Sequence, residues 1–120
     1  MPKKKVLHLA KWYPNKEEPL LGIFIQKHIQ SVKEFYNQKI ISIYQTNKIN
    51  SNINREVNYY SNLEEVVFYH KKGLINKIRV LYRVWQETNR FQPHLIHSHV
   101  IGCTNSFAYI HSKTNKTPFI

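Results

Sequence analysis

Two histidines near position 97 carry the clearest chemical signal in the chain. The sequence reads His97-Ser98-His99 at the end of a short apolar run that is typical of a buried strand. We expect His97 to lie within the sheet packing and His99 to emerge at the carboxyl end of the strand. Imidazole titrates near neutral pH, so His99 is a candidate general acid, general base or hydrogen-bond donor. The alternative is a histidine that is packed for structural reasons alone.

The sequence gives less support to a metal site or to a catalytic nucleophile. No cluster of cysteine, histidine and carboxylate side chains completes a tetrahedral set, so we expect no metal site. Cys103 is the only cysteine, which excludes an internal disulfide and favours a reducing compartment. No base is evident beside it, so a small buried residue is the simpler interpretation. The adjacent pairs Glu17-Glu18 and Glu64-Glu65 should diverge on a loop or strand, which disfavours a two-carboxylate glycosidase site.

The glycines exclude two common nucleotide-binding loops. The chain has three of them, Gly22, Gly73 and Gly102, each in a different segment. A dinucleotide fingerprint or a P-loop needs several glycines together, so that the backbone can approach phosphate. Gly22 precedes a helical pattern, and free N–H groups and the helix dipole favour an anion at such a position. Gly22 is therefore a candidate phosphate contact, or it only permits the turn into the helix.

The elements that position these residues alternate between strand and helix patterns. This alternation predicts an α/β, Rossmann-like, doubly wound and mainly parallel sheet with helices on both faces. Ligands of such sheets bind beyond the carboxyl ends of the strands, which here are followed by the loops 11–22 and 99–104. Apolar and β-branched runs predict strands at 5–10, 39–45, 56–60, 65–70, 94–99 and 117–120. Helical spacing that begins at Leu21 and ends at Tyr36 predicts a helix of about four turns, and further helices are predicted over 74–90 and over 105–113.

The helix over 74–90 and the net charge both suggest an anionic partner. Lysine and arginine number 18 against seven glutamates, which gives a net charge of +11. A membrane surface, nucleic acid or a phosphorylated ligand would complement this charge, although an AT-rich genome also enriches lysine. The expected apolar face of the helix is Leu74, Ile75, Ile78, Leu81, Tyr82 and Trp85. The expected basic face, which is either solvated or in contact with anionic lipid headgroups, carries Lys77, Arg79, Arg83 and Arg90.

The 120 residues fit a single domain that we expect to be incomplete. A last strand at 117–120 with no helix after it leaves one side of the predicted sheet uncovered, so further sequence or a partner chain should supply the cover. The polar stretch 46–55 is expected to be a mobile loop. Every strongly apolar run is far shorter than the roughly 20 residues that a membrane span needs. No secretory signal is evident, since the apolar stretch after Lys3–Lys5 is short and contains His8.

Several segments together resemble one known family. The segments KVLHLAKWYPN, PLLGIFIQKHIQSV, QPHLIHSHVIG and TPFI resemble the N-terminal domain of GT-B glycosyltransferases, most closely the retaining, family 4-like enzymes of bacterial polysaccharide synthesis. The resemblance implies two Rossmann-like domains that face a cleft, with the acceptor on this one. It implies that His99 lines the acceptor pocket as the catalytic-site residue. The loop that would contact the acceptor and the donor phosphates then includes Lys11, Trp12, Tyr13, Gly22 and Phe24.

The implied function is the acceptor-binding half of an enzyme that transfers a sugar from a nucleotide-sugar to a polysaccharide or lipid-linked acceptor. The donor-binding C-terminal domain is absent from these residues, so the chain alone is expected to be inactive. No cofactor is implied besides the nucleotide-sugar donor substrate. The implied location is cytoplasmic, extending to the inner face of the plasma membrane. The alternative function is a non-catalytic basic module that binds an anionic membrane or, with less support, nucleic acid.

Overall fold

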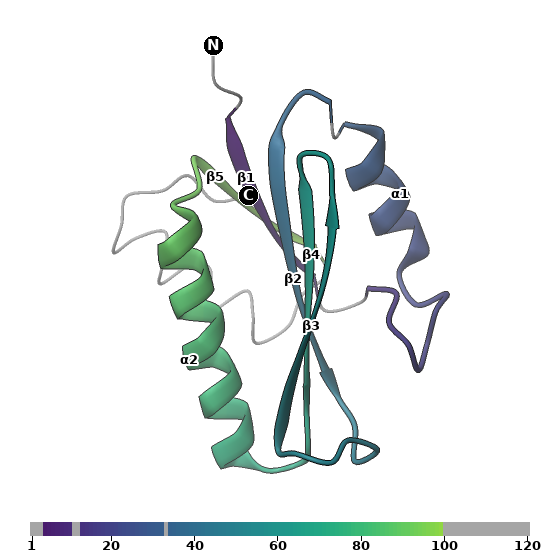
Figure 1. Ribbon diagram of the computed structural model, residues 1–120, viewed down its shortest axis with the longest axis vertical. Coiled ribbons are helices and arrows are strands. Elements are labelled where there is room, and N and C mark those ends of the chain that lie inside the picture. The colour runs from purple at the N-terminus through teal and green to yellow at the C-terminus, as the bar shows by residue number, and fades with distance from the viewer. Residues whose placement is uncertain (1–3, 11–12, 33, 100–120) are drawn as a thin grey trace.

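The computed structural model describes residues 4–10, 13–32 and 34–99. This part of the chain forms five strands and two helices (Figure 1). In chain order they are β1 (Lys5–Ala10), α1 (Ile23–Ser31), β2 (Asn37–Gln45), β3 (Ile53–Tyr60), β4 (Leu63–His70), α2 (Leu74–Phe91) and β5 (Leu95–His99).

The strands form a mixed and mostly parallel sheet in the order β3-β4-β2-β1-β5. The strands β4, β2, β1 and β5 run parallel, and β3 pairs antiparallel with β4 at the edge. The predicted parallel sheet is therefore confirmed. The strands expected at 56–60 and 65–70 form an antiparallel pair, and the second of them extends the sheet, because β4 pairs with β2 from Gln38↔Leu63 to Gln45↔His70.

The two helices lie on opposite faces of this sheet, which Figure 1 shows nearly edge-on. On one face, Ile25 and Ile29 of α1 pack in a cluster with Ala10 and Ile40. On the other face, the cluster formed with α2 contains Leu7, Leu9, Ile41, Val66, Phe68, Val80, Val84 and Ile96. The fold class is α/β, and this arrangement is compatible with a Rossmann-like fold.

Helix α1 is shorter than the predicted four turns. It has nine residues and ends at Ser31, and Val32 already leaves the helical conformation at φ −112°. The N–H of Phe35 then donates to the carbonyl of Val32 at 3.0 Å in the turn toward β2. Tyr36, which the spacing assigned to the apolar face, is 40% exposed. The helical spacing of apolar residues therefore continues beyond Ser31, where the helix itself ends.

Helix α2 has the predicted length but not the predicted face. Leu74, Ile75, Ile78 and Tyr82 are between 57% and 73% exposed. The buried residues are Val80, Val84, Glu87 and Thr88. The small valines let the helix approach the sheet closely. The buried carboxylate of Glu87 is neutralised by ion pairs. The Thr88 hydroxyl donates a hydrogen bond to the Val84 carbonyl at 2.8 Å. Four of the six residues expected on the apolar face are thus exposed, whereas Leu81 and Trp85 are partly buried, so the expected face is wrong in its larger part.

The stretch 46–55, expected to be a mobile loop, is partly strand. Strand β3 begins at Ile53 and so includes Arg55. Before it, Ile49 is 8% exposed and packs with Val67 and Tyr69 of β4. Its many asparagines gave the stretch a polar composition, but its isoleucines attach it to the sheet.

Candidate functional site

The carboxyl ends of β1 and β5 lie side by side. The two strands pair in parallel, with His8 opposite His97 and Ala10 opposite His99. The two loops expected to bind a ligand therefore begin at the same edge of the sheet, and His99 ends β5 as predicted. Several predictions fall outside the described residues: Lys11 and Trp12, and also Gly102, Cys103, the helix over 105–113 and the strand over 117–120.

Beneath this edge, two histidines lie in contact on the α1 side of the sheet. The ring centroids of His8 and His97 are 5.6 Å apart, with an interplanar angle of 48°. Nε2 of His8 lies 2.7 Å from Oε1 of Gln38, whose amide nitrogen donates to the Ile29 carbonyl at 2.9 Å. Burial lowers the pKa of His8 to about 4. Burial, followed by repulsion from His28, also lowers the pKa of His97. The pairing of His97 with His8 in the sheet and the contact between their rings place His97 within the sheet packing, as predicted.

Tyr13 lies in the core rather than on the surface of its loop. It is 2% exposed, and its hydroxyl donates to the carboxylate of Glu65 on β4. The same Glu65 oxygen accepts a bond from the side-chain amide of Gln26 on α1 at 3.1 Å. Burial, together with the neighbouring Glu65, raises the pKa of Tyr13 well above its usual range. Tyr13 thus anchors the start of the loop beneath α1.

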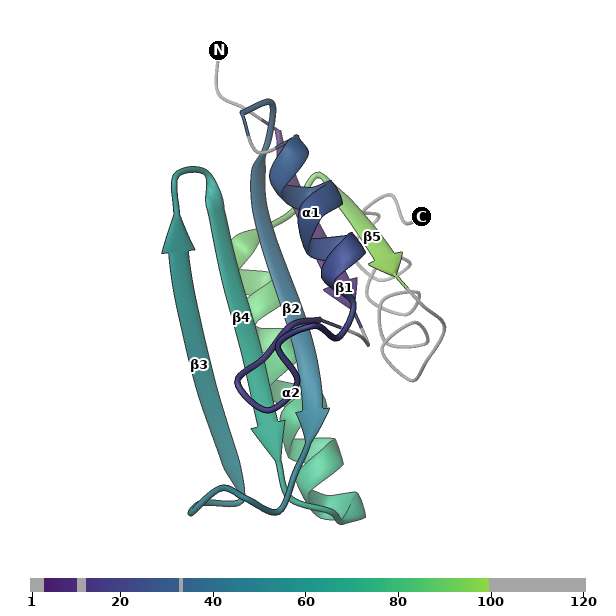
Figure 2. The same cartoon turned by 90° about the vertical axis from the view of Figure 1, so that its right-hand side faces the viewer.

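The following residues cross the sheet toward β4 (Figure 2). Asn15 Oδ1 accepts a hydrogen bond from the N–H of Glu18 at 3.0 Å, which tightens the turn. The Tyr44 hydroxyl of β2 donates to Glu18 at 2.6 Å, and the N–H of Lys16 donates to the Tyr69 hydroxyl of β4 at 3.2 Å. The described part of this loop therefore leans over β2 and β4, on the side away from β5.

The loop returns to the sheet at Gly22, which caps the start of α1. Its φ of 63° and ψ of 27° are in the left-handed region, where a side chain would be strained. Its carbonyl accepts the N–H of Ile25 at 2.9 Å, and no side chain caps the helix. Among the described residues, no partner accepts the Gly22 N–H. Phe24 is 64% exposed on the first turn. Gly22 is thus at a helix N-terminus as predicted, with a donor available to an anion.

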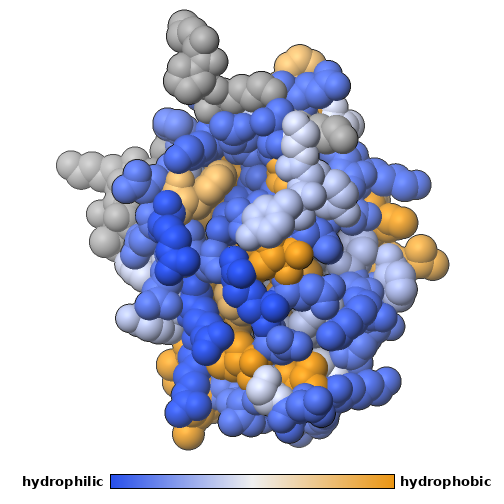
Figure 3. Space-filling model, viewed as in Figure 1, coloured by the Kyte–Doolittle hydropathy of each residue, from blue (hydrophilic) through white to orange (hydrophobic). Residues whose placement is uncertain are grey.

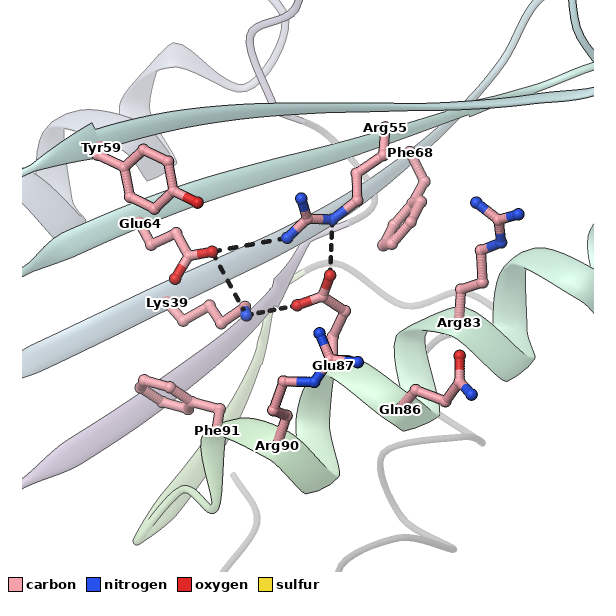
Figure 4. A pocket seen from close by; sticks show the side chains of 10 residues that line it. All are labelled: Lys39, Arg55, Tyr59, Glu64, Phe68, Arg83, Gln86, Glu87, Arg90 and Phe91. Atoms are coloured by element: carbon pink, nitrogen blue, oxygen red, sulfur yellow. Dashed lines mark hydrogen bonds and ion pairs between the residues drawn. The ribbon is translucent and has the colours of Figure 1, made fainter.

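A charged cluster on the opposite, α2 face was missed by the sequence analysis. Lys39 Nζ lies 2.5 Å from Glu87 and 3.5 Å from Glu64. Arg55 lies 2.6 Å from the other Glu87 oxygen and 3.7 Å from Glu64, which closes a ring of four charges (Figure 4). Burial opposes ionisation of Glu87, but the bonds from Lys39 and then Arg55 outweigh it, so the pKa of Glu87 lies below its ordinary value.

Two features of the sequence could have indicated this cluster. Lys39 directly precedes the apolar run of β2, and Glu87 is the one acidic residue within α2. The predicted divergence of Glu64 and Glu65 is confirmed, since Glu64 joins the cluster on the α2 face while Glu65 binds Tyr13 on the α1 face. The alignment of α2 against the sheet, which brings Glu87 over Lys39, could not be predicted from the sequence.

Comparison with known proteins adds no relative: no family model, no curated protein and no solved structure matches the chain. Within the part of the chain that the structure describes, no group of three or more metal-ligating side chains could hold a metal ion. The described helices include none that is both long enough and apolar enough to span a membrane. The class that the fold itself defines is an α/β protein with a five-stranded, mostly parallel sheet covered by a helix on each face.

Proposed function

We propose that this chain is the acceptor-binding half of a GT-B glycosyltransferase, with a doubly wound Rossmann-like fold when complete. The observation that carries the proposal is the parallel pairing of Ala10 with His99, which starts both candidate loops at one edge of the sheet. Ligands of parallel α/β sheets bind at this edge. Crevice walls formed by 11–22 and 99–104 would then accommodate an acceptor hydroxyl and an activated sugar.

In this proposal, the N-terminus of α1 acts on the leaving group. The Gly22 N–H and the positive end of the helix dipole would offset charge on the departing nucleoside diphosphate. The left-handed conformation at Gly22 and its unoccupied N–H support this role. His99 would orient the acceptor hydroxyl. The nucleotide-sugar would be held mainly by a donor domain from further sequence or a partner chain, without a metal ion.

Sugar transfer by this chain together with the donor domain that the proposal requires tests the proposal. We expect transfer from a labelled UDP- or GDP-sugar to a membrane-extract acceptor, and no transfer by residues 1–120 alone. The variant His99→Ala should lower turnover about 100-fold, the loss expected when a reacting hydroxyl is no longer correctly oriented. His28→Ala, an exposed histidine on α1, is the matched control and should retain turnover. Wild-type turnover in His99→Ala, with unchanged thermal unfolding, would refute the role of His99.

A second candidate function, attachment to an anionic membrane, is favoured by the exposed face of α2. Leu74, Ile75 and Ile78 are 73%, 68% and 57% exposed, close to Lys77 and Arg79. Figure 3 shows hydrophobic surface breaking through hydrophilic surface at the lower left, where α2 begins. Apolar side chains beside basic ones suit a helix that lies on anionic headgroups. Flotation with anionic or neutral vesicles tests this function.

A further inference from the structure

A hollow lies away from the edge of the sheet where the sugar site is proposed. A cavity of about 600 Å³ opens between the C-terminal half of α2 and the amino ends of β2 and β4, with Arg55 and Tyr59 of β3 along one side (Figure 4). The proposed sugar site is at the carboxyl edge of the same sheet. The cavity is therefore a separate place on the molecule, and its volume is in the range of small-molecule sites.

Glu87 is the carboxylate expected to neutralise Arg83 and Arg90 on α2, but it is already paired with other residues. Glu87 follows Arg83 by four residues and precedes Arg90 by three, and both spacings place side chains side by side on a helix. Instead, one Glu87 oxygen is bound by Lys39 and the other by Arg55, both from the sheet. The Lys39 and Glu87 side chains are only 6% and 9% exposed, so solvent screens this pairing little.

Among the residues that the structure describes, Arg83 and Arg90 are consequently left without an anionic partner. Neither forms an ion pair with any residue that the structure describes. Of the described residues, four cationic side chains and two carboxylates line the cavity, which leaves a surplus of two positive charges. The surplus matches a dianion. Figure 4 shows the two arginines on α2 on either side of Glu87, with Phe68 and Phe91 as apolar wall.

We propose that this cavity binds a small phosphate-bearing ligand through Arg83 and Arg90. The planar guanidinium fork donates two parallel hydrogen bonds, which match the oxygens of a phosphate group. The Tyr59 hydroxyl and the Gln86 amide, which also line the cavity, are further donors. The ring of four charges engages both oxygens of Glu87. The positive charges of Arg83 and Arg90 are therefore left to interact with an anion. The proposal does not depend on the proposed glycosyltransferase function.

Isothermal titration of the whole chain with pyrophosphate, at constant ionic strength, tests the proposal. We expect saturable binding that Arg83→Gln and Arg90→Gln each weaken about tenfold, the effect of losing a charge-assisted hydrogen bond. Arg79→Gln is the matched control: it removes the same charge from the same helix, but Arg79 does not line this cavity. It should weaken binding less than about twofold, since a charge outside the cavity acts on the ligand only through solvent, which screens it.

Two outcomes would overturn the proposal. Equal weakening by all three substitutions would show that net charge alone attracts the anion, and no saturable binding up to about 10 mM would show that there is no site. Amide shifts of 15N-labelled protein separate this cavity from the helix start at Gly22: Gln86 and Arg90 should move. If a glutamine variant fails to fold, Arg83→Lys retains the charge without the fork and should still lose affinity. Competition by glycerol phosphate or by phosphatidic acid vesicles then distinguishes a soluble ligand from a lipid headgroup.

Discussion

Lys39 and Glu87 show how single charged residues are accommodated in the interior of this protein. Each is nearly buried, and each would be costly there without the other. Breaking a buried pair by removing one partner leaves an uncompensated charge, whereas an exposed pair contributes little. The two residues therefore have effects on stability that their neighbours on the surface do not share.

Replacement of Lys39 should destabilise the fold strongly. Lys39→Met keeps most of the side-chain volume but leaves Glu87 with Arg55 alone, so we expect the free energy of unfolding to fall by about 3 kcal/mol. The control is Lys77→Met on the exposed side of α2, with an expected change within about 0.5 kcal/mol. Urea denaturation of the two variants measures the difference. Similar small losses in both would mean that the buried ion pair is not formed.

His8 should make the protein less stable in mild acid. Its pKa is about 4 in the folded chain and 6.5 ordinarily, so the unfolded state binds more protons between these values. Its contribution is complete above about pH 6.5 and is lost as the pH falls toward 4, by roughly 3 kcal/mol in all. His97 adds to the same loss, because its pKa is also lowered. Glu87 adds a loss at lower pH, as the pH falls through its depressed pKa.

Unfolding experiments at several pH values separate the histidine from the other groups. The variant His8→Gln retains a polar side chain that does not titrate. We expect its stability to change much less than that of the unmodified chain between about pH 7 and pH 4.5. Parallel pH profiles for the two proteins would contradict the assignment to His8.

At the scale of the elements, two substitutions in α2 show which face of this helix packs in the core. Val84→Ala removes fully buried methyl groups and should cost about 2 kcal/mol, whereas Ile78→Ala, at a position 57% exposed, should cost less than about 0.5 kcal/mol. The apolar face expected from the sequence predicts the opposite order. Thermal or urea unfolding of the two variants decides between them.

The elements were easier to predict than their faces and contacts. Strand β1, the parallel pairing and the length of α2 followed from local apolar patterns. The buried face of α2 did not, because the largest apolar side chains outweighed two valines in the pattern. The position of Tyr13 was equally hidden, since its partner Glu65 is 52 residues away in sequence. Long-range contacts of this kind depend on the register of the whole sheet.

At the scale of the whole molecule, two kinds of surface coexist with a net charge of +11. Basic side chains give long-range attraction to any polyanion, and this attraction weakens steeply with salt on duplex DNA, with a slope of about −0.9 per neutralised phosphate. Exposed Leu74, Ile75 and Ile78 add a contact that salt does not screen. The chain should therefore stay bound to a membrane at salt concentrations at which it releases duplex DNA.

Flotation with vesicles at increasing salt measures this difference. We expect the chain to float with anionic vesicles and not with neutral ones, and to remain partly bound at high salt. Ile75→Glu introduces a charge where the helix would enter the headgroup region and should abolish flotation. Lys27→Gln, which lowers the net charge by the same single unit at an exposed site on α1, should weaken it little. Flotation that disappears with salt together with DNA binding, or that Ile75→Glu leaves unchanged, would mean that charge alone attracts the protein and that the exposed face of α2 contacts no lipid.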